Sequence, residues 1–339
     1  MIANAVWIAQ RPLYLAHYLR RMDWQLFERF MEHTRQRRGI SRPMQWLLIV
    51  WHALRYNVSL LECYQFGFFD LAHEDRARWA GTGTMYEFQR RANPPETRDV
   101  LADKRQFFEA YRPFFRHSLY TREKVETQPD LATQILCAHE TLVFKGAKGN
   151  CGAGIEFWAS SELDPTHLAD WMRERDFGLV ESNLMQHPDL QHLSPSGVNT
   201  VRIFTALDAT DRCRILGCRL RIAVDSPVDN LAAGNLAAPV EETTGEVTGP
   251  GVYSDVTRTP ESVHPVTGVP IEGFRIPFWE ETLALARAAA EHRSQNRSVG
   301  WDIVITPEGP GLIEGNHDWC KLVWQLPVQR GLKQLLKDL

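Results

Sequence analysis

The chain has 339 residues, of which 44% are hydrophobic and 24% are charged, the balance of a globular protein with two or three lobes. Its formal net charge of −4, without a broad basic field, disfavours binding to polynucleotides, because nucleic-acid phosphates require clustered positive charge. The six cysteines are scattered without a CxxC pair, which indicates reduced thiols rather than a disulfide framework or a structural zinc site.

The first residues show neither a charged region ahead of an apolar stretch nor a small-residue cleavage pattern, so we expect no signal peptide and a cytoplasmic location. The longest apolar run, near 44–54, contains Gln45 and His52 and is shorter than the roughly 20 residues that a membrane span needs. Eleven tryptophans, many in the N-terminal third, fit either helix packing or an amphipathic surface resting on a membrane or partner. The oligomeric state is left open by the sequence.

In chain order, residues 1–95 place apolar side chains at helical spacing and predict an α-helical lobe. A pair of prolines within 92–100 marks the best candidate boundary. Short β-rich runs then alternate with helices, which predicts an α+β fold with antiparallel hairpins. We expect strands at 142–145, 154–159, 177–182, 198–207, 213–224, 301–306 and 311–316, and helices at 104–117, 164–175 and 277–293.

A glycine-rich segment, residues 144–155, joins the first two predicted strands and carries Lys145, Lys148, Gly149 and Gly152. Glycine lets backbone amides approach phosphate oxygens closely, and the lysines add positive charge. The segment lacks the Gly-Lys-Ser/Thr of a Walker loop, and a strand follows it where a dinucleotide-binding loop would have a helix. It is therefore a candidate phosphate loop of another kind, the alternative being a merely flexible hairpin tip.

Near the C-terminus, residues 300–316 predict a β-hairpin around a Pro-Glu-Gly-Pro-Gly turn. Strand periodicity puts Glu314 and Asn316 on one face, and a register centred on Glu308 puts Asp302 opposite Glu314. Buried carboxylates repel each other unless a cation neutralises them, and Mg²⁺ prefers such oxygen ligands. The hairpin predicts a magnesium site at Asp302, Glu314 and Asn316, the alternative being solvated surface acids.

Taken together and in this order, these motifs resemble those of the ATP-grasp superfamily over residues 100–325. Stretches such as VNTVRIFT and DNLAAGN are most similar to the sugar-transfer-associated ATP-grasp proteins, which are related to α-L-glutamate ligases. The resemblance implies an α+β ATP-grasp fold, in which two α+β lobes clasp ATP, with an N-terminal α-helical lobe where a small α/β domain is usual. The implied domains are 1–95 (helical), 96–182 (phosphate loop) and 183–339 (magnesium hairpin).

The same resemblance assigns roles to individual residues. Catalysis is implied for Arg202 and Lys145. ATP binding is implied for residues of the early Asp-Lys segment, the glycine-rich loop, the interlobe hinge and the 196–203 strand: Lys104, Lys145, Lys148, Gly149, Gly152, Glu181, Ser182, Leu184 and Asn199. The metal ligands are Asp302, Glu314 and Asn316. Arg219, Arg221 and Asn235 are weaker candidates for substrate binding, because alternating arginines on a strand are also common at exposed surfaces.

The implied activity is that of an ATP-dependent carboxylate–amine ligase with ATP and Mg²⁺ as cofactors. In such a ligase a substrate carboxylate attacks the γ-phosphorus of ATP, and an amine then expels phosphate from the acyl phosphate. Its partners are a small-molecule carboxylate and a small-molecule amine. Two alternatives remain open, a kinase acting on a small molecule or sugar and a non-catalytic nucleotide-binding module, while a Cys/His metal hydrolase is disfavoured by the lack of ligand spacing.

Overall fold

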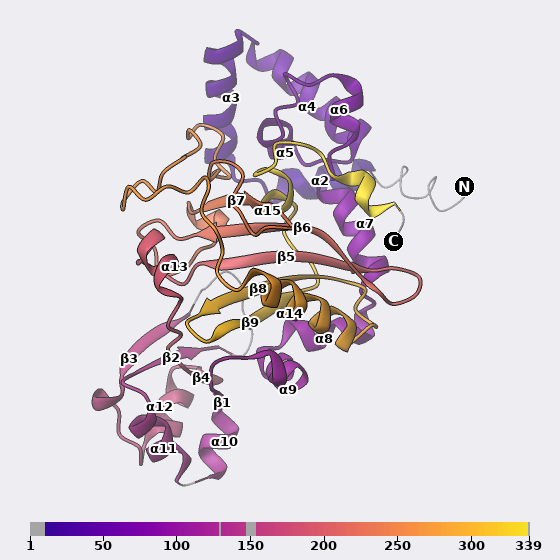
Figure 1. Cartoon of the computed structure of the whole chain (residues 1–339). Coiled ribbons are helices and arrows are strands. Elements are labelled where there is room, and N and C mark those ends of the chain that lie inside the picture. Colours follow the sequence, from indigo (N-terminus) through magenta and orange to yellow (C-terminus); the bar gives the residue numbers. More distant parts are fainter. Residues whose placement is uncertain (1–10, 129, 147–153, 338–339) are drawn as a thin grey trace.

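The structure is a computed structural model that describes residues 11–128, 130–146 and 154–337. It is a mixed fold in which N-terminal helices lie at one end, a larger sheet in the middle and a smaller sheet at the other end (Figure 1). The helices at the N-terminal end are α2 (Arg11–Arg20), α3 (Trp24–Arg38), α4 (Arg42–Tyr56), α5 (Leu60–Gln65), α6 (His73–Ala77) and α7 (Thr82–Ala92). Within the described residues, no helix combines the length and the apolar character needed to cross a membrane.

The first helices begin and end where local chemistry dictates. Asp23 caps α3, because its side chain accepts a hydrogen bond from the backbone N–H of Leu26 at 3.0 Å. Both α3 and α4 stop at residues in the left-handed conformation, Gly39 with φ of 68° and Asn57 with φ of 60°. The helical character predicted for this region is thus confirmed over the described residues.

The smaller sheet has four antiparallel strands in the order β1-β4-β2-β3. Its elements are β1 (Leu119–Thr121), β2 (Thr141–Lys145), β3 (Glu156–Ala159) and β4 (Leu179–Ser182), with helices α10 (Arg122–Thr127), α11 (Leu131–Ala138) and α12 (Leu168–Glu174). Leu142 and Phe144 point into the core formed with these helices. Because side chains alternate along a strand, Val143 and Lys145 point to the opposite face, as does Glu181, which pairs with Val143.

The larger sheet has five antiparallel strands in the order β7-β6-β5-β8-β9. Its strands are β5 (Thr200–Leu207), β6 (Cys213–Ile222), β7 (Leu236–Val240), β8 (Ser298–Thr306) and β9 (Gly309–Asn316). One face places Val201, Ile203 and Ile303 in the main core, beneath helix α14 (Trp279–His292). The alternate residues, Arg202 and Asp302 among them, belong to the other face.

All seven predicted strands and the three predicted helices are present, with shifted ends. The helix expected at 104–117 is α9 (Lys104–Tyr111) followed by a 3-10 turn at Arg112–Phe114, since Pro113 lacks the N–H that would continue the helix. Strands β1 and β7 escaped prediction, because β1 is only three residues long and β7 reads LAAPV, which lacks an alternating pattern.

The helical end is packed firmly on the rest of the chain. At the expected boundary α7 ends and α8 (Pro95–Ala102) begins, but the intervening Asn93 is fully buried. Its Nδ2 donates to the carbonyl oxygens of Ser298 at 2.7 Å and His317 at 2.9 Å. Glu62 of α5 likewise pairs with Lys321 of α15 (Lys321–Gln325) at 2.9 Å. The proline pair therefore marks a helix junction held by buried polar contacts.

Candidate active site between the two sheets

A cleft of about 180 Å³ opens between the inner faces of the two sheets. The smaller sheet contributes Val143, Lys145, Phe157 and Glu181 to its lining. The remaining charged lining residues are Lys104 at the start of α9 and, from the larger sheet and its connections, Arg221, Asp229, Asp302 and Glu314. Apolar side chains complete the walls, among them Ile155, Leu184, Val198 and Ile313. The cleft therefore suits a ligand with both a charged and an apolar part.

On the smaller sheet, the carboxylate of Glu181 interacts with two basic side chains. Lys145 Nζ lies 2.5 Å from Glu181 Oε2, and His117 Nε2 lies 3.6 Å from the same oxygen. Burial alone would raise the pKa of Glu181, but Lys145 and His117 outweigh it and lower this pKa to about 2. Glu181 is thus an ionised carboxylate that holds Lys145 at the cleft.

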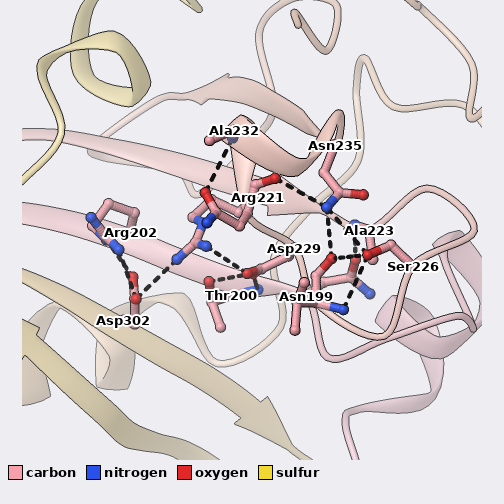
Figure 2. Close-up of polar contacts among 12 residues, drawn as sticks. Asn199, Thr200, Arg202, Arg221, Ala223, Ser226, Asp229, Ala232, Asn235 and Asp302 are labelled. Atoms are coloured by element: carbon pink, nitrogen blue, oxygen red, sulfur yellow. Dashed lines mark hydrogen bonds and ion pairs between the residues drawn. The ribbon is translucent and has the colours of Figure 1, made fainter. Parts of the chain in front are cut away.

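On the larger sheet, Asp302 is shared by two arginines (Figure 2). Arg202 lies directly across from it on β5 and donates from both Nε and Nη2, the second contact being 2.7 Å. Arg221 of β6 donates from Nη1 to Oδ2 at 2.9 Å. Burial opposes ionisation of Asp302, yet the two guanidinium groups prevail and hold its pKa well below the usual range.

Arg221 is itself held between two acids (Figure 2). Its Nη2 lies 2.8 Å from Asp229 Oδ1, and Asp229 Oδ2 accepts from the backbone N–H of Thr200 at 2.8 Å and from its hydroxyl at 2.5 Å. Burial would lower the pKa of Arg221, but Asp229 and Asp302 raise it above the ordinary value. Asp229 was missed by the sequence reasoning, although it opens the quoted DNLAAGN stretch.

The β8–β9 hairpin brings the second carboxyl group to the same place. Asp302 pairs with Glu314, and this predicted register is confirmed. The tight turn alone, which pairs Thr306 with Gly309, would put Ile313 opposite Asp302, but a bulge next to Asp302 advances β9 by one residue. Asn316 Nδ2 donates to Glu314 Oε1 at 3.2 Å. Burial, and then the charge of Asp302, raises the pKa of Glu314.

The donor set at the hairpin fits magnesium chemically. Asp302 and Glu314 offer carboxyl oxygens at the cleft, Asn316 offers an amide, and Mg²⁺ prefers such hard ligands. Burial first, and then the charge of Asp302, raise the pKa of Glu314, and a divalent cation bound there would favour its charged form. Both oxygens of Asp302 already accept from arginines, so a metal bound there would share this carboxylate with Arg202 and Arg221. Among the described residues, no group of three or more His, Cys, Asp or Glu side chains is arranged to hold a metal.

A family model described as sugar-transfer associated ATP-grasp matches residues 84–339, about three quarters of the chain. The chain belongs to this family. The match begins within α7, so most of the helical end lies outside it. No curated protein matches the chain.

Solved ATP-grasp structures resemble this one only distantly. A biotin carboxylase domain of Hydrogenobacter thermophilus 2-oxoglutarate carboxylase, solved with MgADP, ADP and bicarbonate, is 13% identical with a TM-score of 0.39, over 68% of this chain and 46% of that chain. The D-cycloserine synthetase DcsG is 12% identical with a TM-score of 0.40, over 73% of this chain and 74% of that chain. The biotin carboxylase of Campylobacter jejuni is 10% identical with a TM-score of 0.42, over 71% of this chain and 46% of that chain. The chain thus spans less than half the length of the two carboxylases.

Of the other predicted ATP-grasp positions, Ser182 and Leu184 line the cleft with Lys104. Lys148, Gly149 and Gly152 lie outside the described residues. Burial lowers the pKa of Lys104, while the neighbouring carboxylates of Glu314 and Glu181 oppose this effect. The structure therefore gathers two lysines and three acids of the predicted set, Glu181, Asp302 and Glu314, around one cleft.

Three predicted ATP-grasp residues are directed elsewhere. Asn199 and Asn235 are fully buried in a polar network that supports the segment after β6 (Figure 2). Asn235 Oδ1 accepts from the backbone N–H of Val224, and its Nδ2 donates to a neighbouring carbonyl oxygen. Arg219 donates from Nε to the carbonyl oxygen of Trp324 at 3.0 Å, and burial lowers its pKa to about 10. Strand alternation puts Arg219 and Arg221 on one face, but α15 covers the end where Arg219 lies.

Replacing Asn199 with alanine is expected to lower the free energy of unfolding by about 2 kcal/mol or more, because it leaves buried groups without partners. Asn199 Oδ1 accepts from the backbone N–H of Ala223 at 2.9 Å, and its Nδ2 donates to Gln186 Oε1 at 2.8 Å. Urea titration measures the loss. ATP affinity, measured calorimetrically on the folded variant, should stay unchanged, and a selective loss of affinity would return Asn199 to the nucleotide site.

Proposed function

We propose that the chain is an ATP-dependent ligase that joins a small-molecule carboxylate to an amine through an acyl phosphate. The observation that supports this function is the meeting of Lys104 and Lys145 with Asp302 and Glu314 at one cleft between two sheets. Lysines at one side match the phosphates of ATP, and carboxylates at the other match the magnesium that accompanies them. A reaction of ATP needs both groups, because positive charge binds the triphosphate and carboxylates bind its magnesium.

Each residue then has a defined task. Lys145, oriented by Glu181, binds phosphate oxygens together with Lys104. Asp302 and Glu314, with Asn316, hold Mg²⁺, which when bound neutralises negative charge on the phosphates. Of the predicted arginines, Arg221 is the one that lines the cleft, so it is the best placed of them to receive the carboxylate substrate or the departing phosphate. Val143, Ile155, Phe157 and Leu184 supply an apolar wall for the base.

The domain division and the location belong to the same proposal. We place a helical domain at 1–95, a phosphate-loop domain at 96–182 and a magnesium-hairpin domain at 183–339, in a cytoplasmic protein. In this division each sheet belongs to one domain, since β1 to β4 end at Ser182 and β5 begins at Thr200. Lys148, Gly149 and Gly152, which lie outside the described residues, are assigned to the same nucleotide site.

A substrate screen tests the reaction type. The protein is incubated with ATP, Mg²⁺ and panels of amino acids and sugar acids, with and without amines, and ADP release is followed. A ligase releases ADP and phosphate fully only when acid and amine are both present. A stable phosphorylated product formed without an amine would instead establish a kinase, and nucleotide binding without turnover on any acceptor would establish a non-catalytic module.

Replacing Lys145 with alanine is expected to weaken ATP binding by roughly tenfold to a hundredfold, the value of a charged hydrogen bond of about 1.5–3 kcal/mol. Isothermal titration with ATP and Mg²⁺ measures the dissociation constant. Lys124→Ala is the matched control, because Lys124 is exposed and pairs with Glu109 outside the cleft lining. Equal affinity of Lys145→Ala and the control would remove Lys145 from the nucleotide site.

A further inference from the structure

Helix α4 carries apolar side chains on the face that it does not bury. Its inner face buries residues such as Ile49 and Ala53. Met44, Leu47 and Trp51, spaced three and four residues apart, share the opposite face and are 48%, 66% and 48% exposed. A surface helix normally presents polar residues to water. This exposed stripe, here called the α4 face, has the character of a contact surface.

Helices that neighbour α4 also expose large apolar side chains. Trp24 at the start of α3 is 49% exposed, and its ring centroid lies 6.4 Å from that of Trp46 on α4. Helix α2 also lies beside α4, since Arg11 Nη1 donates to the carbonyl oxygen of Leu54 at 2.9 Å. Leu13 of α2 is 69% exposed. Trp24 and Leu13 thus add exposed apolar area to the same helical end as the α4 face.

Positive charge is concentrated in the same part of the chain. Residues 1–60 contain nine arginines, no lysine and three acidic residues, a net charge of +6, which leaves −10 for residues 61–339 of a chain whose total is −4. Arg20, Arg21 and Arg55 are exposed, and within the described residues they form no ion pair with a carboxylate. Arg55 lies one helical turn beyond Trp51, so it continues the α4 face.

An anionic lipid surface complements this combination. Tryptophan rings and aliphatic side chains favour the boundary between headgroups and acyl chains, and unpaired arginines are attracted to anionic headgroups. The described helices do not cross a bilayer, so the contact is peripheral. We propose that the α4 face, with Trp24 and the exposed arginines Arg20, Arg21 and Arg55, docks the protein on the surface of an anionic membrane.

Docking of this kind is compatible with an accessible cleft. The helices α3, α4 and α6 lie at the end of the molecule opposite the smaller sheet, with the larger sheet between them (Figure 1). The cleft opens between the two sheets, away from α4. The membrane contact is independent of the reaction catalysed there, and either proposal can fail without the other.

Flotation of the full chain with vesicles tests the docking. Vesicles of equal parts phosphatidylglycerol and phosphatidylcholine should carry the protein upward at low salt, vesicles of phosphatidylcholine alone should not, and high salt should release it. The double variant Leu47→Glu, Trp51→Glu should bind the anionic vesicles at least tenfold more weakly. Val266→Glu is the matched control, because Val266 is 64% exposed outside the helical end, and it should bind as the parent does.

A second variant separates docking from misfolding. Arg20→Gln, Arg21→Gln leaves the apolar stripe intact and should weaken binding while making it less sensitive to salt; thermal melting verifies that all variants are folded. The proposal is overturned if the full chain ignores anionic vesicles or if the Leu47, Trp51 variant floats as well as the parent. It is equally overturned if that variant instead abolishes a dimer, since the α4 face would then be the contact with a second copy of the chain. Vesicle binding that appears only after removal of residues 1–10 would also overturn it, because that segment would then be what covers the face.

Discussion

Replacing Glu314 with glutamine is expected to reduce ATP turnover roughly 10²–10³-fold while leaving the protein as stable as the parent or more so. The loss of turnover follows from removing a carboxylate that we place at the magnesium. The stability follows from electrostatics, because burial and Asp302 both disfavour the charged form of Glu314. ADP release at saturating ATP measures the first effect, and urea unfolding the second.

The raised pKa of Glu314 also predicts how the stability difference between the parent and Glu314→Gln changes with pH. A carboxyl group whose pKa is raised on folding destabilises the folded state once pH rises above its unfolded value, because ionisation is then harder in the folded protein. The parent should therefore lose stability relative to Glu314→Gln as pH rises through the raised pKa, and the two should converge in acid. Glu308→Gln in the exposed turn of the same hairpin is the control and should change neither quantity. A variant less stable than the parent at neutral pH would contradict the electrostatic account.

Replacing Glu62 with glutamine is expected to cost about 3–5 kcal/mol of unfolding free energy, since it leaves Lys321 facing a buried site without its counter-charge. Glu62 is 2% exposed, and it accepts from the backbone N–H and the hydroxyl of Thr82 at 2.9 and 2.6 Å. Its pair with Lys321 ties the helical end to α15. Chemical denaturation at neutral pH measures the cost.

The same pair also predicts acid sensitivity. Burial would raise the pKa of Glu62, but Lys321 and Thr82 outweigh it, so the pKa lies below its ordinary value of 4.5. Its contribution is therefore present above the unfolded pKa and is lost as pH falls through the lowered one. The gap between parent and Glu62→Gln should shrink in that range. Glu32→Gln, which breaks the exposed pair with Arg35, should leave the free energy of unfolding nearly unchanged, because water and salt screen exposed ion pairs.

Local patterns predicted elements well where one short segment contains the whole signal. The Ala-rich body of 277–293 predicted a helix whose observed ends, Trp279 and His292, differ by two residues and one residue. The β-rich run at 198–207 predicted β5, whose observed ends are Thr200 and Leu207. The hairpin register was predicted as well, although by a longer turn than the one observed, because the bulge next to Asp302 compensates for the tight turn.

Local patterns did not predict contacts between side chains that lie far apart in the sequence. Arg202 and Asp302 are 100 residues apart, and Lys145 and Glu181 are 36 apart. The sequence reasoning gave Arg202 a catalytic role and Asp302 a metal-binding role, and the contact by which the arginine neutralises the acid appeared only in the fold. It also grouped Arg219 with Arg221, because strand alternation says which face a residue occupies and leaves open what covers that face.

By itself, then, the sequence of this protein determined the family motifs, the helical and strand segments and the charged residue types that the cleft needs, since these depend on near neighbours along the chain. Only the tertiary structure decided which charges pair. Pairing depends on the order of strands in the two sheets, on the bulge in β9 and on α15 covering Arg219, and these follow from burying the whole core at once.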